Sequence, residues 1–176
     1  MKDTVIKVSK SRIMKAIRTE PFLLAGHWAN YSGEELVGDK NCSVCAVGSV
    51  LRDVLDENQN AEMITKAANK TIDYTLSVGP RGGLEALNLK DIHESAKCLA
   101  NIGMYMNALS TYFESLWEMT VHRNRRNDNY NSYNLSRHQV YRIRQKLLKF
   151  VQAEFPSSIE INIDGAIPKK GVKVVS

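Results

Sequence analysis

Residues 89–121 read LKDIHESAKCLANIGMYMNALSTYFESLWEMTV, and this stretch decides the fold class. Its apolar residues recur every three or four positions, a spacing that places them on one face of a helix. The pattern predicts one long helix, or two helices joined near Gly103, where glycine costs about 1 kcal/mol relative to alanine. Such a helix would be the central member of a bundle. The residues of the apolar face are Ile92, Ala96, Leu99, Met106, Leu109, Phe113, Leu116 and Trp117.

Several other helix starts carry a capping residue, whose side-chain oxygen accepts a hydrogen bond from the first turn of the helix. Ser9 or Ser11 can begin an early helix, and Asn60 can begin a later one. Ser136 is followed by Gln139 at the spacing of a capping box, in which the two residues cap each other's backbone. These signals predict helices on both sides of the central stretch.

Both ends of the chain have the pattern of β-strands. Residues 4–8 are rich in β-branched side chains, and Ile159, Ile161 and Ile163 alternate with polar residues, the period of a half-buried strand. Residues 171–175 are a candidate partner strand. We therefore expect a mainly α protein, a compact bundle of about five helices with a small β element formed near the termini. A chain of 176 residues is expected to form a single domain.

The positive charge of the chain is concentrated in one segment. The formal net charge is +5, yet residues 122–149 hold eight of the 24 Lys and Arg residues and one of the 19 acids. That segment therefore carries +7 and the remainder carries −2. Such an asymmetry points to a surface that attracts polyanions.

The candidate binding region consists of an Asn- and Tyr-rich loop, residues 123–135, and a basic helix, residues 136–155. Arginines in such a region can contact phosphates, and tyrosines can stack on unpaired bases. A solvated cationic face, or a face that docks on an acidic protein, would have the same pattern. The candidate binding residues are Arg123, Arg125, Arg126, Tyr130, Tyr133, Arg137, Arg142, Arg144, Lys146 and Lys149.

The cysteines offer one weak candidate for catalysis. Cys42 and Cys45 form a C-x-x-C pair, but a structural zinc needs four ligands and only Cys98 and scattered histidines remain, so we expect no metal or other cofactor. Cys42 is predicted near a helix N-terminus, where a thiol pKa falls, so it is the one candidate nucleophile. Cys45 is expected to be buried, because it lies on the apolar side of that helix.

The start of the chain is too charged for a signal peptide, and the chain contains no run of about 18 apolar residues that could span a membrane. With an odd number of cysteines, these features favour a cytoplasmic protein with free thiols and no membrane partner. The oligomeric state stays open at this point.

A short resemblance concerns residues 22–55. The order Gly26-His27-Trp28, a loop, and then a helix reading Cys-Ala-Val-Gly-Ser from Cys45 resembles small uncharacterised helical domains of phage and bacterial accessory genes. Those domains carry a Trp followed by a Cys-Ala-Val-Gly-Ala helix, so Ser49 here replaces the usual alanine. The resemblance implies no reaction. It implies an accessory or host-interaction protein.

We therefore expect a non-enzymatic protein whose basic helix and loop contact nucleic acid or a nucleoprotein machine. One alternative is a phage-type accessory protein that inhibits or docks on a host protein through the same surface. A second alternative is a cysteine-dependent hydrolase or transferase that uses Cys42.

Overall fold

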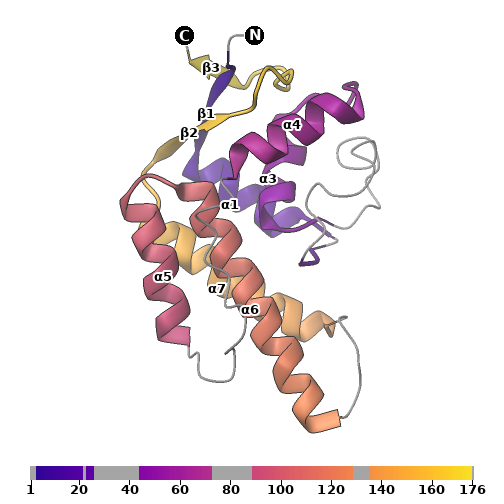
Figure 1. Cartoon of the computed structure of the whole chain (residues 1–176), viewed down its shortest axis with the longest axis vertical. Coiled ribbons are helices and arrows are strands. Elements are labelled where there is room, and N and C mark those ends of the chain that lie inside the picture. The colour runs from indigo at the N-terminus through magenta and orange to yellow at the C-terminus, as the bar shows by residue number, and fades with distance from the viewer. Residues whose placement is uncertain (1–2, 22, 26–43, 73–88, 129–134, 176) are drawn as a thin grey trace.

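The computed structural model describes residues 3–21, 23–25, 44–72, 89–128 and 135–175. Within these ranges the chain forms six helices and a three-stranded sheet (Figure 1). The mainly α fold is confirmed, with six helices in place of about five. In chain order the elements are β1 (Val5–Ser9), α1 (Lys10–Thr19), α3 (Ala46–Val54), α4 (Ala61–Thr71), α5 (Leu89–Asn101), α6 (Tyr105–Asp128), α7 (Arg137–Glu154), β2 (Ser158–Asn162) and β3 (Lys173–Val175).

The sheet joins the two ends of the chain, as the sequence predicts, but with β1 in the middle. Its order is β2-β1-β3 and both pairings are antiparallel. Ile6 lies opposite Ile161 and Val8 opposite Ile159, and all four side chains are buried. The third strand therefore pairs with β1, and not with β2. In Figure 1 the sheet lies at one end of the molecule and the last turns of α6 lie at the other.

The central apolar stretch forms two helices, the second of the two predicted alternatives. Gly103 adopts φ +84°, a conformation that only glycine reaches without strain. Its N–H donates to Ala100 O at 3.0 Å, and Met104 N–H donates to Leu99 O at 2.9 Å, which is the Schellman pattern of a helix C-terminus. The chain turns there, so that α5 packs against α6.

The core lies between α6 and its neighbours. Leu109, Phe113 and Trp117 of α6 are almost completely buried, as are Leu147 and Phe150 of α7. Helix α3 is enclosed by the rest of the protein. Its first six residues are all buried, and the helix packs against α1 and α6. Cys45, which the sequence predicts to be buried, is 1% exposed.

The predicted caps are present. Ser9, Asn60 and Ser136 each accept a hydrogen bond from the backbone N–H three residues on, and Ser136 forms the full capping box with Gln139. Helix α3 is capped by Cys45, whose Sγ accepts from Gly48 N–H at 3.5 Å. Each of these helices thus begins where a local side chain satisfies its first free backbone donors.

Candidate nucleic-acid interface

Arg123, Arg125 and Arg126 are helical, and this differs from the predicted loop over 123–135. Helix α6 continues through Asp128, so the first six residues of that segment extend the helix. Arginine is a good helix former, and a cation near a helix C-terminus interacts favourably with the helix dipole. The asparagines of the segment favour a turn, but one of them, Asn124, is held in place by a contact with α7.

That contact joins the two basic segments. Asn124 Nδ2 donates to Gln139 Oε1 at 3.1 Å, and Gln139 Nε2 donates to Asn124 Oδ1 at 2.7 Å. Asn124 lies between Arg123 and Arg125 in the last turns of α6, and Gln139 lies in the first turn of α7. The paired amides therefore hold the end of α6, which carries Arg123 and Arg125, against the start of α7, which carries Arg137.

Most of the charges of α7 lie on its outward face. Helix α7 buries Ile143, Leu147, Leu148, Phe150 and Val151 on one side, and its exposed cations lie on the other. Together with Arg123 and Arg125, two of the three exposed arginines of α6, they form what we call the α6–α7 basic surface; Arg126, the third, has an interaction of its own and is not counted in it. Within the described residues, no member of this set forms an ion pair. The set is Arg123, Arg125, Arg137, Arg142, Lys146 and Lys149.

Arg144 is turned inward. Its Nη1 donates to the carbonyl oxygens of Ile17 and Arg18, the latter at 3.2 Å, at the C-terminal end of α1. Burial lowers the pKa of the Arg144 guanidinium from its ordinary value, and the charge of Glu20 acts in the opposite direction. Arg144 therefore caps α1 and does not belong to the α6–α7 basic surface. This bond brings the end of α1, which carries the exposed Arg18, close to α7.

Three other predicted residues, Tyr130, Tyr133 and Cys42, lie outside the described residues. Two further exposed residues lie on or close to α7 and are not among the binding residues that the sequence predicts. One is Arg18. The other is Tyr141, which is 57% exposed on α7. The sequence holds a signal for Tyr141, since it lies one position before Arg142 and off the apolar stripe of α7.

Charge placement in α7 is unfavourable for the helix itself. Its first turn contains Arg137 and His138 and no acid. The N-terminus of a helix carries a partial positive charge, so cations there reduce helix stability by a few tenths of a kcal/mol to about 1 kcal/mol. Arg125 lies at the C-terminal end of α6, where a cation stabilises the helix through its dipole. Arg137 lies at the N-terminal end of α7, where a cation has no such stabilising effect.

The two described cysteines differ in exposure. Cys45 is buried, and burial, with a smaller effect from the Glu114 carboxylate, raises the pKa of its thiol far above the usual range. The thiol therefore stays protonated and unreactive at neutral pH. Cys98 is exposed. Among the described residues, no three His, Cys, Asp or Glu side chains lie close enough together to hold a metal ion.

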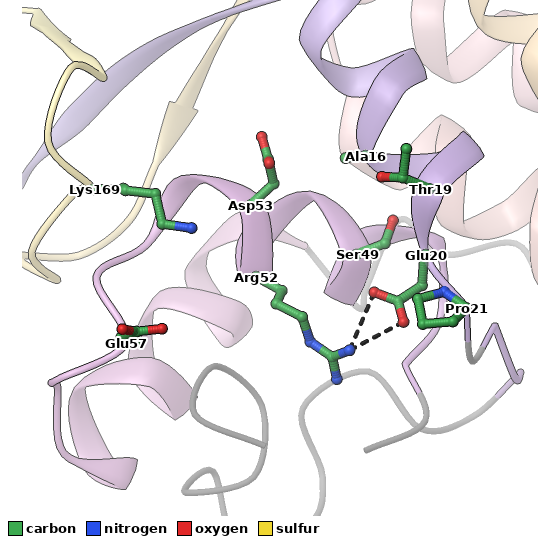
Figure 2. A pocket seen from close by; sticks show the side chains of 9 residues that line it. All are labelled: Ala16, Thr19, Glu20, Pro21, Ser49, Arg52, Asp53, Glu57 and Lys169. Atoms are coloured by element: carbon green, nitrogen blue, oxygen red, sulfur yellow. Dashed lines mark hydrogen bonds and ion pairs between the residues drawn. The ribbon is translucent and has the colours of Figure 1, made fainter. Parts of the chain in front are cut away.

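A separate pocket of about 270 Å³ opens between α1, α3 and the segment that precedes β3 (Figure 2). Its floor holds a buried ion pair, in which Arg52 Nη1 lies 3.0 and 3.2 Å from the two carboxylate oxygens of Glu20. Asp53, also in the lining, accepts from Arg12 Nε at 2.7 Å. The lining thus holds both positive and negative groups, and none of them belongs to the α6–α7 basic surface. The lining residues are Ala16, Thr19, Glu20, Pro21, Ser49, Arg52, Asp53, Glu57 and Lys169.

The chain matches no family model, no curated protein and no solved structure. The resemblance of residues 22–55 to phage accessory domains therefore stays a prediction. None of the described helices combines the length and apolar character needed to cross a bilayer.

Proposed function

We propose that this chain binds nucleic acid through the α6–α7 basic surface and acts without catalysis. The observation that carries the proposal is the pairing of Asn124 with Gln139, which gathers cations from two helices. Cations that are exposed and enter no ion pair within the described residues keep their full charge for an external partner. A polyanion is the partner that such a surface attracts most strongly.

The size of the charge set leads to a quantitative expectation. If all six members contact phosphates, raising the salt concentration from about 50 to 200 mM weakens binding on the order of a thousandfold, because each contact releases counterions. Charged groups at the rim of a protein–protein interface contribute far less, so a salt effect of this size distinguishes nucleic acid from an acidic protein partner.

The unfavourable charge in the first turn of α7 is a second line of support. A cation at that position reduces helix stability, so its presence there is best explained by an external anion. Replacing Arg137 by Glu reverses the effect. The variant loses a phosphate contact but gains a favourable interaction with the helix dipole, which separates binding from folding.

The test is a charge reversal with a matched control. Arg137→Glu/Arg142→Glu and Lys170→Glu/Lys173→Glu both lower the formal net charge from +5 to +1, and all four residues are exposed. We expect the first variant to lose at least about tenfold in affinity for DNA or RNA, with a shallower salt dependence. The second, altered at and beside β3, should retain most of the affinity of the wild type.

Equal losses in the two variants would mean that only net charge matters, and would contradict the proposal. A pull-down from a nuclease-treated lysate provides the other comparison. A protein partner that is retained after nuclease treatment, and lost in Arg137→Glu/Arg142→Glu, would favour docking on a protein over nucleic-acid binding.

A further inference from the structure

Tyr141 is the only exposed residue among the Phe, Tyr and Trp residues that the structure describes. Its side chain is 57% exposed, whereas the aromatic rings of Tyr112, Phe113 and Phe150 lie in the core. Alanine, or a polar residue such as glutamine, would favour the helix at least as well as tyrosine. The ring therefore has no evident role in stabilising the described fold.

The surroundings of Tyr141 are cationic. On a helix, residues three and four positions apart are neighbours, so Tyr141 lies next to His138 and Arg137, both exposed. Arg142 follows it directly and is also exposed. The ring is thus part of a surface on which its nearest exposed neighbours are basic.

A further cation comes from a distant part of the sequence. Arg144 lies three positions after Tyr141, on the same side of α7, and its guanidinium binds the carbonyl oxygen of Arg18. That bond places the end of α1 beside this turn of α7, and the Arg18 side chain is exposed. The end of α1, which carries the exposed Arg18, therefore lies close to the turn of α7 that carries Tyr141.

We infer that the α6–α7 basic surface takes single-stranded nucleic acid, with a base stacked on the Tyr141 ring and the flanking phosphates held by Arg137, Arg142 and Arg18. This inference rests on the proposed nucleic-acid binding and adds the class of nucleic acid. Arginines that follow the backbone, combined with an aromatic ring that accepts any base, are the combination that binds single strands without a fixed sequence.

A duplex offers no such partner to the ring. Its bases are stacked on one another, so only their edges face the grooves, and a tyrosine on a packed helix cannot reach a base face without opening the duplex. An unpaired base presents its whole face. The cations from Arg137 to Lys149 extend over about 18 Å of helix, enough to follow a short run of backbone.

The experiment compares one sequence in three forms. An oligonucleotide of about 12 residues, within the range of site sizes of single-strand-binding folds, is prepared as labelled single-stranded DNA, single-stranded RNA and duplex DNA. Fluorescence anisotropy gives the Kd of each for the wild type, Tyr141→Ala and Tyr141→Phe at several salt concentrations. The two single strands show whether the sugar matters.

We expect the wild type to prefer a single strand to the duplex. Tyr141→Ala should weaken single-strand binding about tenfold, the loss typical of one base–aromatic stack, and should leave the slope of the salt dependence unchanged. Tyr141→Phe should bind like the wild type, since the ring and not the hydroxyl group carries the contact. Thermal unfolding checks that both variants fold, as an exposed position allows.

The outcomes separate the two proposals. A wild type that binds the duplex as tightly as the single strands, or a Tyr141→Ala variant with unchanged affinity, overturns the inference and leaves nucleic-acid binding in place. A Tyr141→Ala variant with a shallower salt dependence overturns it too, because the loss would then be electrostatic. A wild type that binds none of the three forms overturns both proposals.

Discussion

The side-chain amide of Gln139 serves two helices at once. Its Oε1 accepts from Ser136 N–H at 3.1 Å, completing the capping box of α7, and from Asn124 Nδ2 at 3.1 Å, while its Nε2 donates to Asn124 Oδ1. The start of α7 and the end of α6 are therefore fixed by one residue. The relative position of the cations on the two helices depends on it.

Replacing either amide should affect stability and binding to different degrees. Gln139→Ala removes the pair and the bond from Ser136 N–H to the Gln139 side chain, although the Ser136 hydroxyl still accepts from the backbone at position 139, so we expect a loss of about 1–2 kcal/mol in the free energy of unfolding. Asn124→Ala removes the pair alone and should cost less than about 1 kcal/mol while still weakening nucleic-acid binding. Chemical denaturation and anisotropy measure the two effects.

Asn69→Ala, at an exposed position of α4, is the control for the Asn-to-Ala change in a helix. An Asn124→Ala variant that matches this control in stability and in binding would refute the role of the pair.

Arg142 and Arg144 are two positions apart on α7 but should behave in opposite ways. Arg144→Met leaves the carbonyls of Ile17 and Arg18 without their charged donor, and we expect it to lower the free energy of unfolding by about 1–3 kcal/mol. Arg142→Met, at an exposed position, should change it by less than about 0.5 kcal/mol and should weaken binding instead. Equal stability of the two variants would show that Arg144 does not hold α1 to α7.

Cys45 should make stability fall at high pH. Its pKa is raised in the folded protein, so the folded state keeps the proton that the unfolded chain releases near its ordinary value of 9.0. The contribution of Cys45 to stability is therefore complete below pH 9 and is lost as the pH rises above it, by about 1.4 kcal/mol per pH unit. Urea titrations from pH 7 to 10.5 would detect this loss. In Cys45→Ala the extra loss should be absent, and parallel pH profiles for the two proteins would contradict the assignment.

Alkylation of the native protein tests the remaining catalytic alternative. With iodoacetamide at neutral pH we expect Cys98, which is exposed, to be modified, and the buried Cys45 to be modified only after unfolding. Peptide mapping by mass spectrometry follows each thiol separately. The alkylation rate of Cys42 tests the hydrolase or transferase hypothesis. A nucleophile with a lowered pKa would react faster than a model thiol. A rate equal to that of the model thiol would rule the hypothesis out.

Gly103 should tolerate no ordinary side chain without cost. At φ +84° an alanine is strained although nothing lies within 4 Å of the position its Cβ would take. We expect Gly103→Ala to lower the free energy of unfolding by about 1–2 kcal/mol, and Gly103→Asn to lower it by less, because asparagine adopts this conformation more readily. If the two variants are equally stable, the turn between α5 and α6 does not depend on the left-handed conformation.

The features that the sequence predicted well are local ones. The capping box of Ser136 and Gln139 is written in four consecutive residues, and the break at Gly103 follows from a single residue type. Burial of Ile159 and Ile161 follows from their alternation with polar residues. In each case the residues that decide the structure are neighbours in the chain, so tertiary contacts did not have to be known.

The features that the sequence did not reveal depend on contacts between distant segments. Arg144 is a basic residue within the basic segment, so the sequence predicts that it binds a partner. Only the packing of α1 against α7 shows that it caps another helix. The sequence predicts that Asn124 lies in a loop, because nothing in the sequence identifies Gln139 as its partner. Arg18 lies more than a hundred positions from the basic segment and joins it only through the fold.

The central position of β1 has a consequence for the order of assembly. Val5 pairs with Asn162 on one side and with Val175 on the other, so β1 is synthesised long before either of its partner strands. Closing such long loops is slow, and contacts of this kind are formed late in folding. All of the described helices can be synthesised before the sheet can form. The nascent chain must therefore carry an unpaired β1 until α7 and the strands that follow it have been made.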